Sequence, residues 1–279
     1  MKKLLRTFLA ALWTQVIISL TRHRWWSVPA AILLLLGLCL ADLKVRGGSF
    51  AVANQWDVLL WACNQPFLVM IIYPALFLAL VSDSASSELE SNWFYLTAGR
   101  ISSRVLWCWS KNGAVALLAV FFTALLFLGF GVLGGLATSF GGSWSRLVYL
   151  SGWKYPGGLP LSCLAIPPPL VALRIFLLLS VGLAALGAVA LNLALVARRA
   201  FWGWAAGVVL CLLSYGAWHQ LHHPLSFLLP SLHLLLAAHR ECNPSMPSVF
   251  TVPASMAAGA ALFLIAGMAG RLNVSKRDL

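Results

Sequence analysis

The sequence predicts an all-α integral membrane protein, and three observations support that prediction. Hydrophobic residues make up 61% of the 279 residues, and charged residues make up only 9%, whereas soluble domains carry about 25% charged residues. The apolar residues gather in runs that approach or exceed the roughly 20 residues needed to cross a bilayer. The charged residues stand in clusters between those runs. A soluble enzyme, a disordered chain and a disulfide-stabilised scaffold are all inconsistent with this pattern.

Six apolar runs are candidate transmembrane spans. They cover residues 25–41, 58–81, 113–138, 175–197, 201–218 and 250–270. The second run contains Asn64, Gln65, Pro66 and Pro74, which predicts a kinked or packed helix rather than one facing lipid. No internal repeat or low-complexity linker divides the chain. We therefore expect one transmembrane domain over 1–279, with a six-span bundle at 25–270.

The distribution of Lys and Arg predicts that both termini are cytoplasmic. With the N-terminus inside, the inner segments hold 13 Lys and Arg residues and the outer segments hold 6, and cytoplasmic loops carry such an excess. Tryptophans cluster near the ends of the runs, as in interfacial aromatic belts. The basic residues therefore serve to orient the chain, and no nucleic acid is expected as a partner. The predicted location is the inner or plasma membrane, as a multi-pass protein.

Residues 1–24 predict an amphipathic helix that lies in the inner membrane interface. Its apolar positions recur at three- and four-residue steps: Leu5, Phe8, Leu9, Leu12, Val16 and Leu20. Its polar positions lie elsewhere on the helix: Lys2, Lys3, Arg6 and Gln15. A signal peptide is the alternative, but Thr14–Gln15 interrupts the apolar run and no small-residue cleavage site follows.

No motif for catalysis or nucleotide binding occurs in the sequence. A phosphate-binding loop, a zinc-protease helix and a nucleophile elbow are all missing, so the chain is not expected to hydrolyse ATP or to act as an enzyme by itself. The spans also lack a mid-span Asp, Glu or Lys, which disfavours an ion-driven transporter. We expect no cofactor in this chain.

The outer segment 219–251 contains most of the histidines: His219, His222, His223, His233 and His239. His219 and His223 are one helical turn apart and are candidates to share a metal; interfacial histidines on an amphipathic segment are the other interpretation. Cys163 and Cys242 are both predicted outside, where an oxidising compartment permits a disulfide. Spacing alone does not establish that pairing.

The inner segment 82–111 is the most polar part of the chain. Acidic Glu88 and Glu90 precede the apolar Trp93 and Phe94, and basic residues follow. Apolar anchors surrounded by charges suit a short cytoplasmic helix that docks into a partner protein. A solvated loop with balanced charges is the alternative, but it does not account for large apolar residues among the charges.

This segment resembles the second cytoplasmic segment of type-2 ABC exporter permeases. The resemblance lies in the run Glu88…Asn92-Trp93…Leu96…Arg100-Ile101-Ser102…Arg104…Lys111. The usual proline of the family's turn is absent, and Gly99-Arg100 stand in its place. The layout is also similar, with an interfacial N-terminal helix, a short basic turn at Arg198–Arg199 and an apolar outer segment at 219–251. That outer segment resembles the family's re-entrant outer helices between spans five and six.

The resemblance implies a transport subunit that pairs with a separate ABC ATPase subunit, which binds ATP and Mg. A second permease subunit, identical or related, would complete the pathway within the membrane lipids. The implied ATPase-docking residues are Glu88, Glu90, Trp93, Phe94, Arg100, Ser102 and Arg104, with Trp13 and Arg22 on the N-terminal helix.

Polar residues inside the spans are few, which favours an amphipathic cargo. Asn64, Gln65 and Asn192 are the candidates to line its path, although hydrogen bonding between packed helices is at least as consistent with them. Export of an antimicrobial peptide, a lipid or a drug remains open.

Two other functions compete with transport. A membrane scaffold or assembly factor would handle metal or haem through the outer histidine segment. An intramembrane enzyme acting on lipids is the least consistent alternative, because the spans show no polar catalytic constellation.

Overall fold

The computed structural model describes residues 2–47, 53–82, 103–151, 161–218 and 224–276, and these ranges are helical with short connections and no strand. The elements in chain order are α1 (Lys2–Leu20), η1 (His23–Trp26), α2 (Ser27–Gly47), α3 (Gln55–Asn64), η3 (Leu68–Ile72), α4 (Tyr73–Val81), α7 (Arg104–Leu128), η4 (Gly129–Leu133), α8 (Gly134–Ala137), α9 (Arg146–Ser151), α10 (Leu161–Leu164), α11 (Pro168–Ala197), α12 (Ala200–Ala217), η7 (Pro224–Leu228), η8 (Pro230–Leu234), η9 (Leu236–Ala238) and α13 (Val252–Lys276). The all-α prediction is confirmed for this part of the chain.

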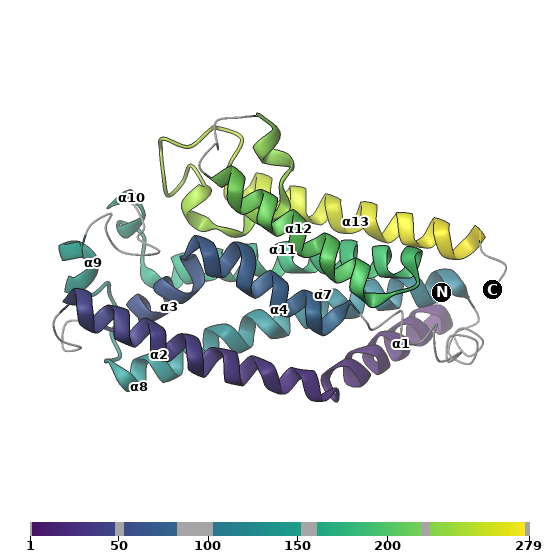
Figure 1. Cartoon of the computed structure of the whole chain (residues 1–279), viewed down its shortest axis with the longest axis horizontal. Coiled ribbons are helices and arrows are strands. Elements are labelled where there is room, and N and C mark those ends of the chain that lie inside the picture. The colour runs from purple at the N-terminus through teal and green to yellow at the C-terminus, as the bar shows by residue number, and fades with distance from the viewer. Residues whose placement is uncertain (1, 48–52, 83–102, 152–160, 219–223, 277–279) are drawn as a thin grey trace.

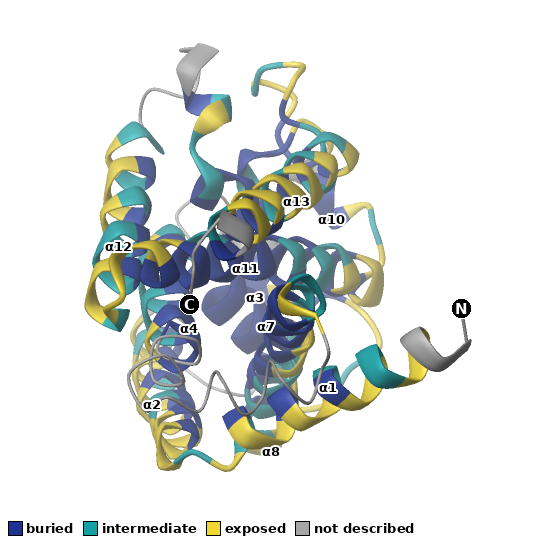
Figure 2. Cartoon of the chain, turned by 90° about the vertical axis from the view of Figure 1, so that its right-hand side faces the viewer, coloured by how far each residue is buried: buried dark blue, intermediate teal, exposed yellow. Residues whose placement is uncertain are grey.

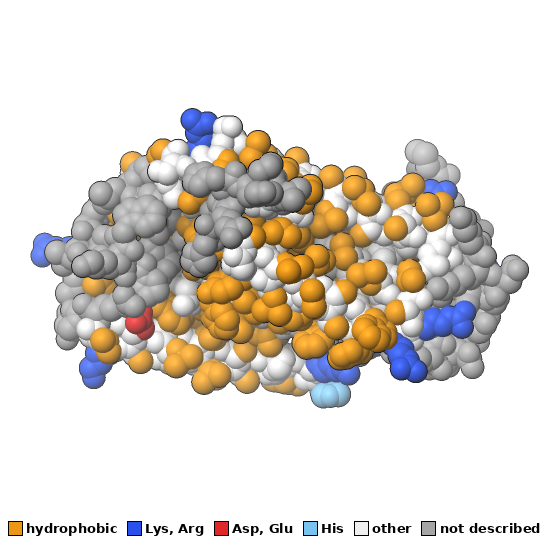
Figure 3. Space-filling model, turned by 45° about the horizontal axis from the view of Figure 1, so that its top comes forward, with side chains coloured by type: hydrophobic (Ala, Val, Ile, Leu, Met, Phe, Trp, Pro, Cys, Tyr) orange, Lys and Arg blue, Asp and Glu red, His pale blue; other side chains and the backbone are white. Residues whose placement is uncertain are grey.

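Five helices are long and apolar enough to cross a membrane. They are His23–Val45, Arg104–Ala137, Pro168–Ala197, Ala200–Ala217 and Val252–Val274. Figure 3 shows the surface that these helices present: hydrophobic side chains cover the middle of the molecule, and Lys and Arg side chains lie toward its two ends. This distribution matches a bilayer, in which apolar surface faces the hydrocarbon and charges face the headgroups.

A sixth apolar segment is bent. The pair Gln55–Asn64 and Leu68–Val81 meets at an angle of 58°. Gln65 ends α3 in an extended conformation, with φ −76° and ψ 125°, because the ring of Pro66 disfavours helical geometry at the residue before it. Pro74 falls in the first turn of α4, where a missing N–H costs little. The chain is bent here as the sequence suggested, and Pro66 explains the place of the bend.

Helix α11 is the centre of the bundle. It packs against α7, α12, α13 and α4, and Figure 2 shows it as a largely buried helix surrounded by the others. Small residues on several of its faces allow close approach by its neighbours. At Gly182 an added Cβ would meet the side chain of Leu234, and at Gly187 it would lie 2.6 Å from Val115 Cγ1.

The connection from α11 to α12 is the short basic turn that the sequence indicated. Arg198 takes a left-handed conformation with φ 56° and ends α11, and Arg199 is extended before α12 begins. The two helices then run back along each other, and Gly203 of α12 packs directly on the Ala190 carbonyl of α11.

The chain returns to the end where it started. Figure 1 shows the N- and C-termini at the same end of the molecule, which we call the terminal end; α9 and α10 lie at the opposite end.

The segment after α12 is built differently from the spans. Within residues 224–251 it forms the short 3-10 helices η7, η8 and η9, and η8 packs against α11, α12 and α13. Prolines at 224 and 230 begin two of these short turns, so the described part of the predicted re-entrant outer segment consists of 3-10 helices.

Candidate functional site

Most of the predicted docking residues lie outside the described part of the chain. These are Glu88, Glu90, Trp93, Phe94, Arg100 and Ser102, within residues 83–102. Arg104 is described and begins α7, directly after Ser103, whose Oγ accepts a hydrogen bond from the N–H of Leu106 at 3.4 Å. The helix therefore starts within the predicted cytoplasmic segment, and Arg104 to Lys111 form its first two turns.

The sequence places Lys111 in the polar cytoplasmic segment, but in the structure its side chain is buried. Its side chain is 2% exposed, and Nζ lies 5.8 Å from the centre of the Trp107 ring in a cation–π arrangement. An aromatic face partly replaces the water that a buried ammonium loses. Lys111 is thus part of the bundle interior at the terminal end.

Helix α1 lies along α7 at this end. Leu12 reaches the backbone of α7 at Gly113, where an added Cβ would lie only 2.8 Å from Leu12 Cδ1. Trp13 is 60% exposed on the other side of α1, and Arg22 precedes η1. One expectation was wrong: Gln15 was assigned to the polar face but is buried, because α1 carries apolar residues on both sides and turns its Gln15 side against the bundle.

Asn192, a candidate for the cargo path, is part of an interhelical hydrogen-bond chain. Its Nδ2 donates to Asn112 Oδ1 of α7 at 3.0 Å and to the Ala188 carbonyl at 2.8 Å. Asn112 in turn donates to the Cys108 carbonyl at 2.9 Å. On its other side, Asn192 Oδ1 occupies the place that a side chain at Gly270 of α13 would need. These contacts join α7, α11 and α13, so they favour a packing role for Asn192.

The other two path candidates lie elsewhere and make separate contacts. Asn64 is fully buried at the end of α3, and its Oδ1 accepts from the backbone N–H of Ala237 at 3.3 Å. Gln65, the next residue, lines a groove of about 690 Å³ between α2 and the bent pair α3–α4. The three candidates therefore do not form one polar path within this chain.

The groove that Gln65 lines is apolar along most of its length and polar at one end. Leu34 and Leu38 of α2 line it. At the polar end, Trp61 Nε1 donates to Asp42 Oδ2 at 2.9 Å, beside Gln65. A long apolar surface with a carboxylate and an amide at one end is complementary to an amphipathic molecule.

A hydrogen-bond network holds the start of α3 at the opposite end. The Asp57 carboxylate accepts from the Asn54 N–H at 2.7 Å and from the Ser145 hydroxyl at 2.9 Å, while Asn54 Oδ1 accepts from the Trp56 N–H. This reciprocal capping satisfies backbone donors that a helix start leaves without partners. Gln55 adds two bonds with the backbone of Gly141. The network fixes the loop after α8 on the bent pair.

Two of the outer histidines, His233 and His239, are buried and meet one serine. Ser255 Oγ of α13 lies 2.8 Å from His233 Nδ1 and 2.8 Å from His239 Nε2. The remaining ring nitrogens lie 2.7 Å from the Phe227 carbonyl and 2.9 Å from the Leu235 carbonyl. Burial lowers the pKa of both rings, that of His239 to about 4, because a cation loses its hydration there.

A metal bound by His233 and His239 would have to compete with the protein contacts of their ring nitrogens. All four ring nitrogens of His233 and His239 already face protein atoms, and in the described ranges no three His, Cys, Asp or Glu side chains form a metal-ligand group. His219, His222 and His223 lie outside those ranges, so the predicted His219–His223 pair stays a prediction.

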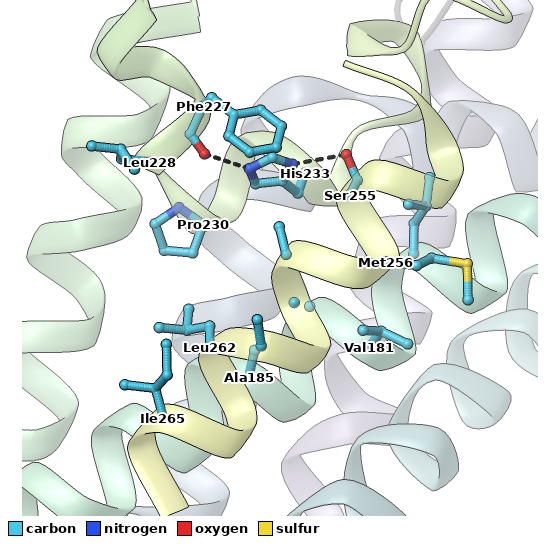
Figure 4. A pocket seen from close by; sticks show the side chains of 15 residues that line it. Val181, Ala185, Phe227, Leu228, Pro230, His233, Ser255, Met256, Leu262 and Ile265 are labelled. Carbon is cyan, nitrogen blue, oxygen red and sulfur yellow. Dashed lines mark hydrogen bonds between the residues drawn. The ribbon is translucent and has the colours of Figure 1, made fainter. Parts of the chain in front are cut away.

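His233 and Ser255 also line a pocket between the outer segment and the spans. Its volume is about 200 Å³, and its walls come from α11, α13, η7 and η8. Figure 4 shows the two polar residues at one end of this pocket and apolar side chains, among them Leu262 and Ile265, at the other. The pocket is thus apolar apart from the hydrogen-bonded pair.

Cys163 and Cys242 form a disulfide. It ties α10 to the turn after His239, two segments that are 79 residues apart in sequence. The pairing that the spacing left open is therefore present in the structure, at the opposite end of the bundle from the termini.

Sequence reasoning missed the contacts of Asn112 and Ser255. A lone Asn and a lone Ser in apolar helices carry no spacing signal, and their roles follow only from which helices become neighbours.

Comparisons of the chain with protein-family models, with curated proteins and with solved structures give no match.

Proposed function

We propose that this chain is the membrane-spanning permease subunit of an ATP-driven ABC exporter of the type-2 kind. It forms the translocation pathway with a second permease subunit, and a separate ATPase subunit binds ATP and Mg. The observation that carries the proposal is the junction at the terminal end. There the N-terminal helix α1 packs on α7, the same helix that begins inside the polar segment resembling an ATPase-docking segment.

This junction gives the ATPase a mechanical connection to the bundle. A displacement of the segment before Arg104 moves the first turns of α7, to which α1 is fitted at Gly113. The Asn112–Asn192 hydrogen bond continues the contact from α7 into α11. Packed helices with polar contacts transmit small shifts because they do not deform continuously. The chain needs no catalytic residue of its own for this role.

The disulfide at one end of the bundle and the Lys and Arg distribution support one orientation of the chain in the membrane. A disulfide persists in an oxidising compartment and not in the cytosol, so the end that holds Cys163–Cys242 faces outward. The termini then lie in the cytoplasm, in agreement with the excess of Lys and Arg in the inner segments. In this orientation the bent pair α3–α4 is the second of six spans.

The cargo is amphipathic. The groove between α2 and the bent pair supports this part of the proposal, since an apolar wall ends at Asp42, Trp61 and Gln65. A sugar or a small ion would find few polar partners along this surface. A peptide, a lipid or a drug with an apolar body and a polar end matches it.

The test is purification of the tagged chain from its native host in a mild detergent, with mass spectrometry of whatever remains bound. The expected result is an ATP-binding subunit in stoichiometric amount. Glu88→Ala and Trp93→Ala should lose that subunit, while Phe140→Ala, which removes an exposed aromatic side chain near the opposite end, should keep it. Recovery of the wild-type chain without any ATP-binding subunit would overturn the proposal.

A further inference from the structure

The contacts that join His233, Ser255 and His239 require a definite number of hydrogens. Four short contacts link His233, Ser255, His239 and two backbone carbonyls, at 2.7 to 2.9 Å. Each such contact needs one hydrogen between its two heavy atoms to be a hydrogen bond. Four hydrogens are therefore required for the arrangement that the structure shows.

The neutral side chains supply only three. A neutral imidazole carries one N–H, and the Ser255 hydroxyl carries one O–H. The carbonyls of Phe227 and Leu235 only accept, so His233 Nε2 and His239 Nδ1 must each hold the hydrogen of their ring. His233 Nδ1 and His239 Nε2 then both present lone pairs to Ser255 Oγ, which can donate to one of them. The other contact would set two lone pairs against each other at 2.8 Å.

One additional proton completes the arrangement, and a second does not fit. With one proton added, one ring donates to Ser255 Oγ, and the hydroxyl donates to the other ring. With two protons added, both rings would donate to the same oxygen, its own hydrogen would have no acceptor among these groups, and two cations would lie on either side of one atom. Desolvation makes that second charge costly.

The surroundings confine the charge to this group. The facing positions of α11 and α13 around the pocket are apolar or small, among them Leu178, Val181 and Gly259. Among the described residues, the charged side chains that follow His239 on its turn are Arg240 and Glu241. The Glu241 carboxylate accepts from the Val252 N–H at 2.9 Å, and its charge raises the pKa of His239, whereas burial and His233 lower it.

We infer that His233, Ser255 and His239 form a binding site for a single proton, shared between the two rings through the serine hydroxyl. The site connects η8, the turn after η9 and the first turns of α13. This outer part of the protein therefore has two charge states, neutral and singly positive, and does not reach the doubly positive state of two independent histidines. The inference does not depend on the proposed transport function.

The test counts protons on the two rings. Nitrogen-15 chemical shifts of labelled histidine distinguish an N–H from a lone pair, and His233→Gln and His239→Gln spectra assign the signals. Between about pH 8 and about pH 3, a range that includes the ordinary histidine pKa and reaches below the lowered pKa of His239, the wild-type pair should take up one proton in total. Uptake of none, or of two, would overturn the inference.

Variants of Ser255, whose hydroxyl lies between the two rings, test whether this residue is needed for proton uptake. Ser255→Ala removes the oxygen that accepts from the protonated ring, so the pair should take up no proton in this range. Ser255→Thr keeps a hydroxyl and should still take up one. Ser214→Ala is the matched control, because Ser214 is a buried serine whose hydroxyl donates to the Leu210 carbonyl of its own helix; it should behave as the wild type. Unchanged proton uptake in a folded Ser255→Ala protein would also overturn the inference.

Discussion

Replacement of Gly203 by alanine tests the close packing of α11 and α12. An added Cβ at Gly203 would collide with the Ala190 carbonyl oxygen and would lie 2.9 Å from Ala194 Cβ. A backbone carbonyl cannot rotate away as a side chain does, so the two helices must separate locally. Overpacking of this kind costs about 1–3 kcal/mol, and alanine returns about 1 kcal/mol of helix propensity over glycine. We therefore expect a net loss of up to about 2 kcal/mol in the free energy of unfolding.

The matched control is Gly37→Ala in α2, because an added Cβ at Gly37 meets nothing within 4 Å. This variant should gain up to about 1 kcal/mol from helix propensity alone. Denaturant unfolding in detergent, followed by circular dichroism, measures both variants against the wild type. If Gly203→Ala proves as stable as Gly37→Ala, the close approach of α11 and α12 at this position is refuted.

Three further experiments test contacts between distant parts of the chain. Asn192→Ala should lower the free energy of unfolding, and a double-mutant cycle with Asn112→Ala in the same unfolding assay should give a coupling near 0.6 kcal/mol, the average order for such bonds in membranes; strict additivity would show that the pair does not interact. Asp57→Ala leaves two buried donors without their acceptor and should cost about 1.5–3 kcal/mol, and an unchanged unfolding midpoint would contradict that role. Alkylation of the unreduced protein should leave Cys163 and Cys242 unmodified, and mass spectrometry showing both modified would contradict the disulfide.

The course of the helices could be largely predicted from the sequence. Hydropathy located the apolar runs, and Pro66 located the bend, because both effects depend on residues that are neighbours in sequence. The start of α7 could not be found in this way. The sequence placed Arg104 and Lys111 in a polar cytoplasmic segment, but Lys111 is buried beside Trp107 within α7, and that burial depends on the packing of neighbouring helices.

The candidate sites were less predictable. Asn64, Gln65 and Asn192 were grouped because all are polar residues within apolar runs, yet each has different neighbours in the structure. The outer histidines suggested metal binding by their number, whereas His233 and His239 use their nitrogens in hydrogen bonds that involve Ser255 of the following helix.

The amino-acid sequence is enough to predict that this protein is helical, apolar on its surface and more basic in the segments expected to be cytoplasmic. Composition and local periodicity suffice for these properties. Which isolated polar residues meet depends on the packing of the helices: Asn112 meets Asn192 across 80 residues, and Asp57 meets Ser145 across 88. The physical reason is that apolar helices can pack in many orders with similar burial, and the order that forms decides which polar groups find partners.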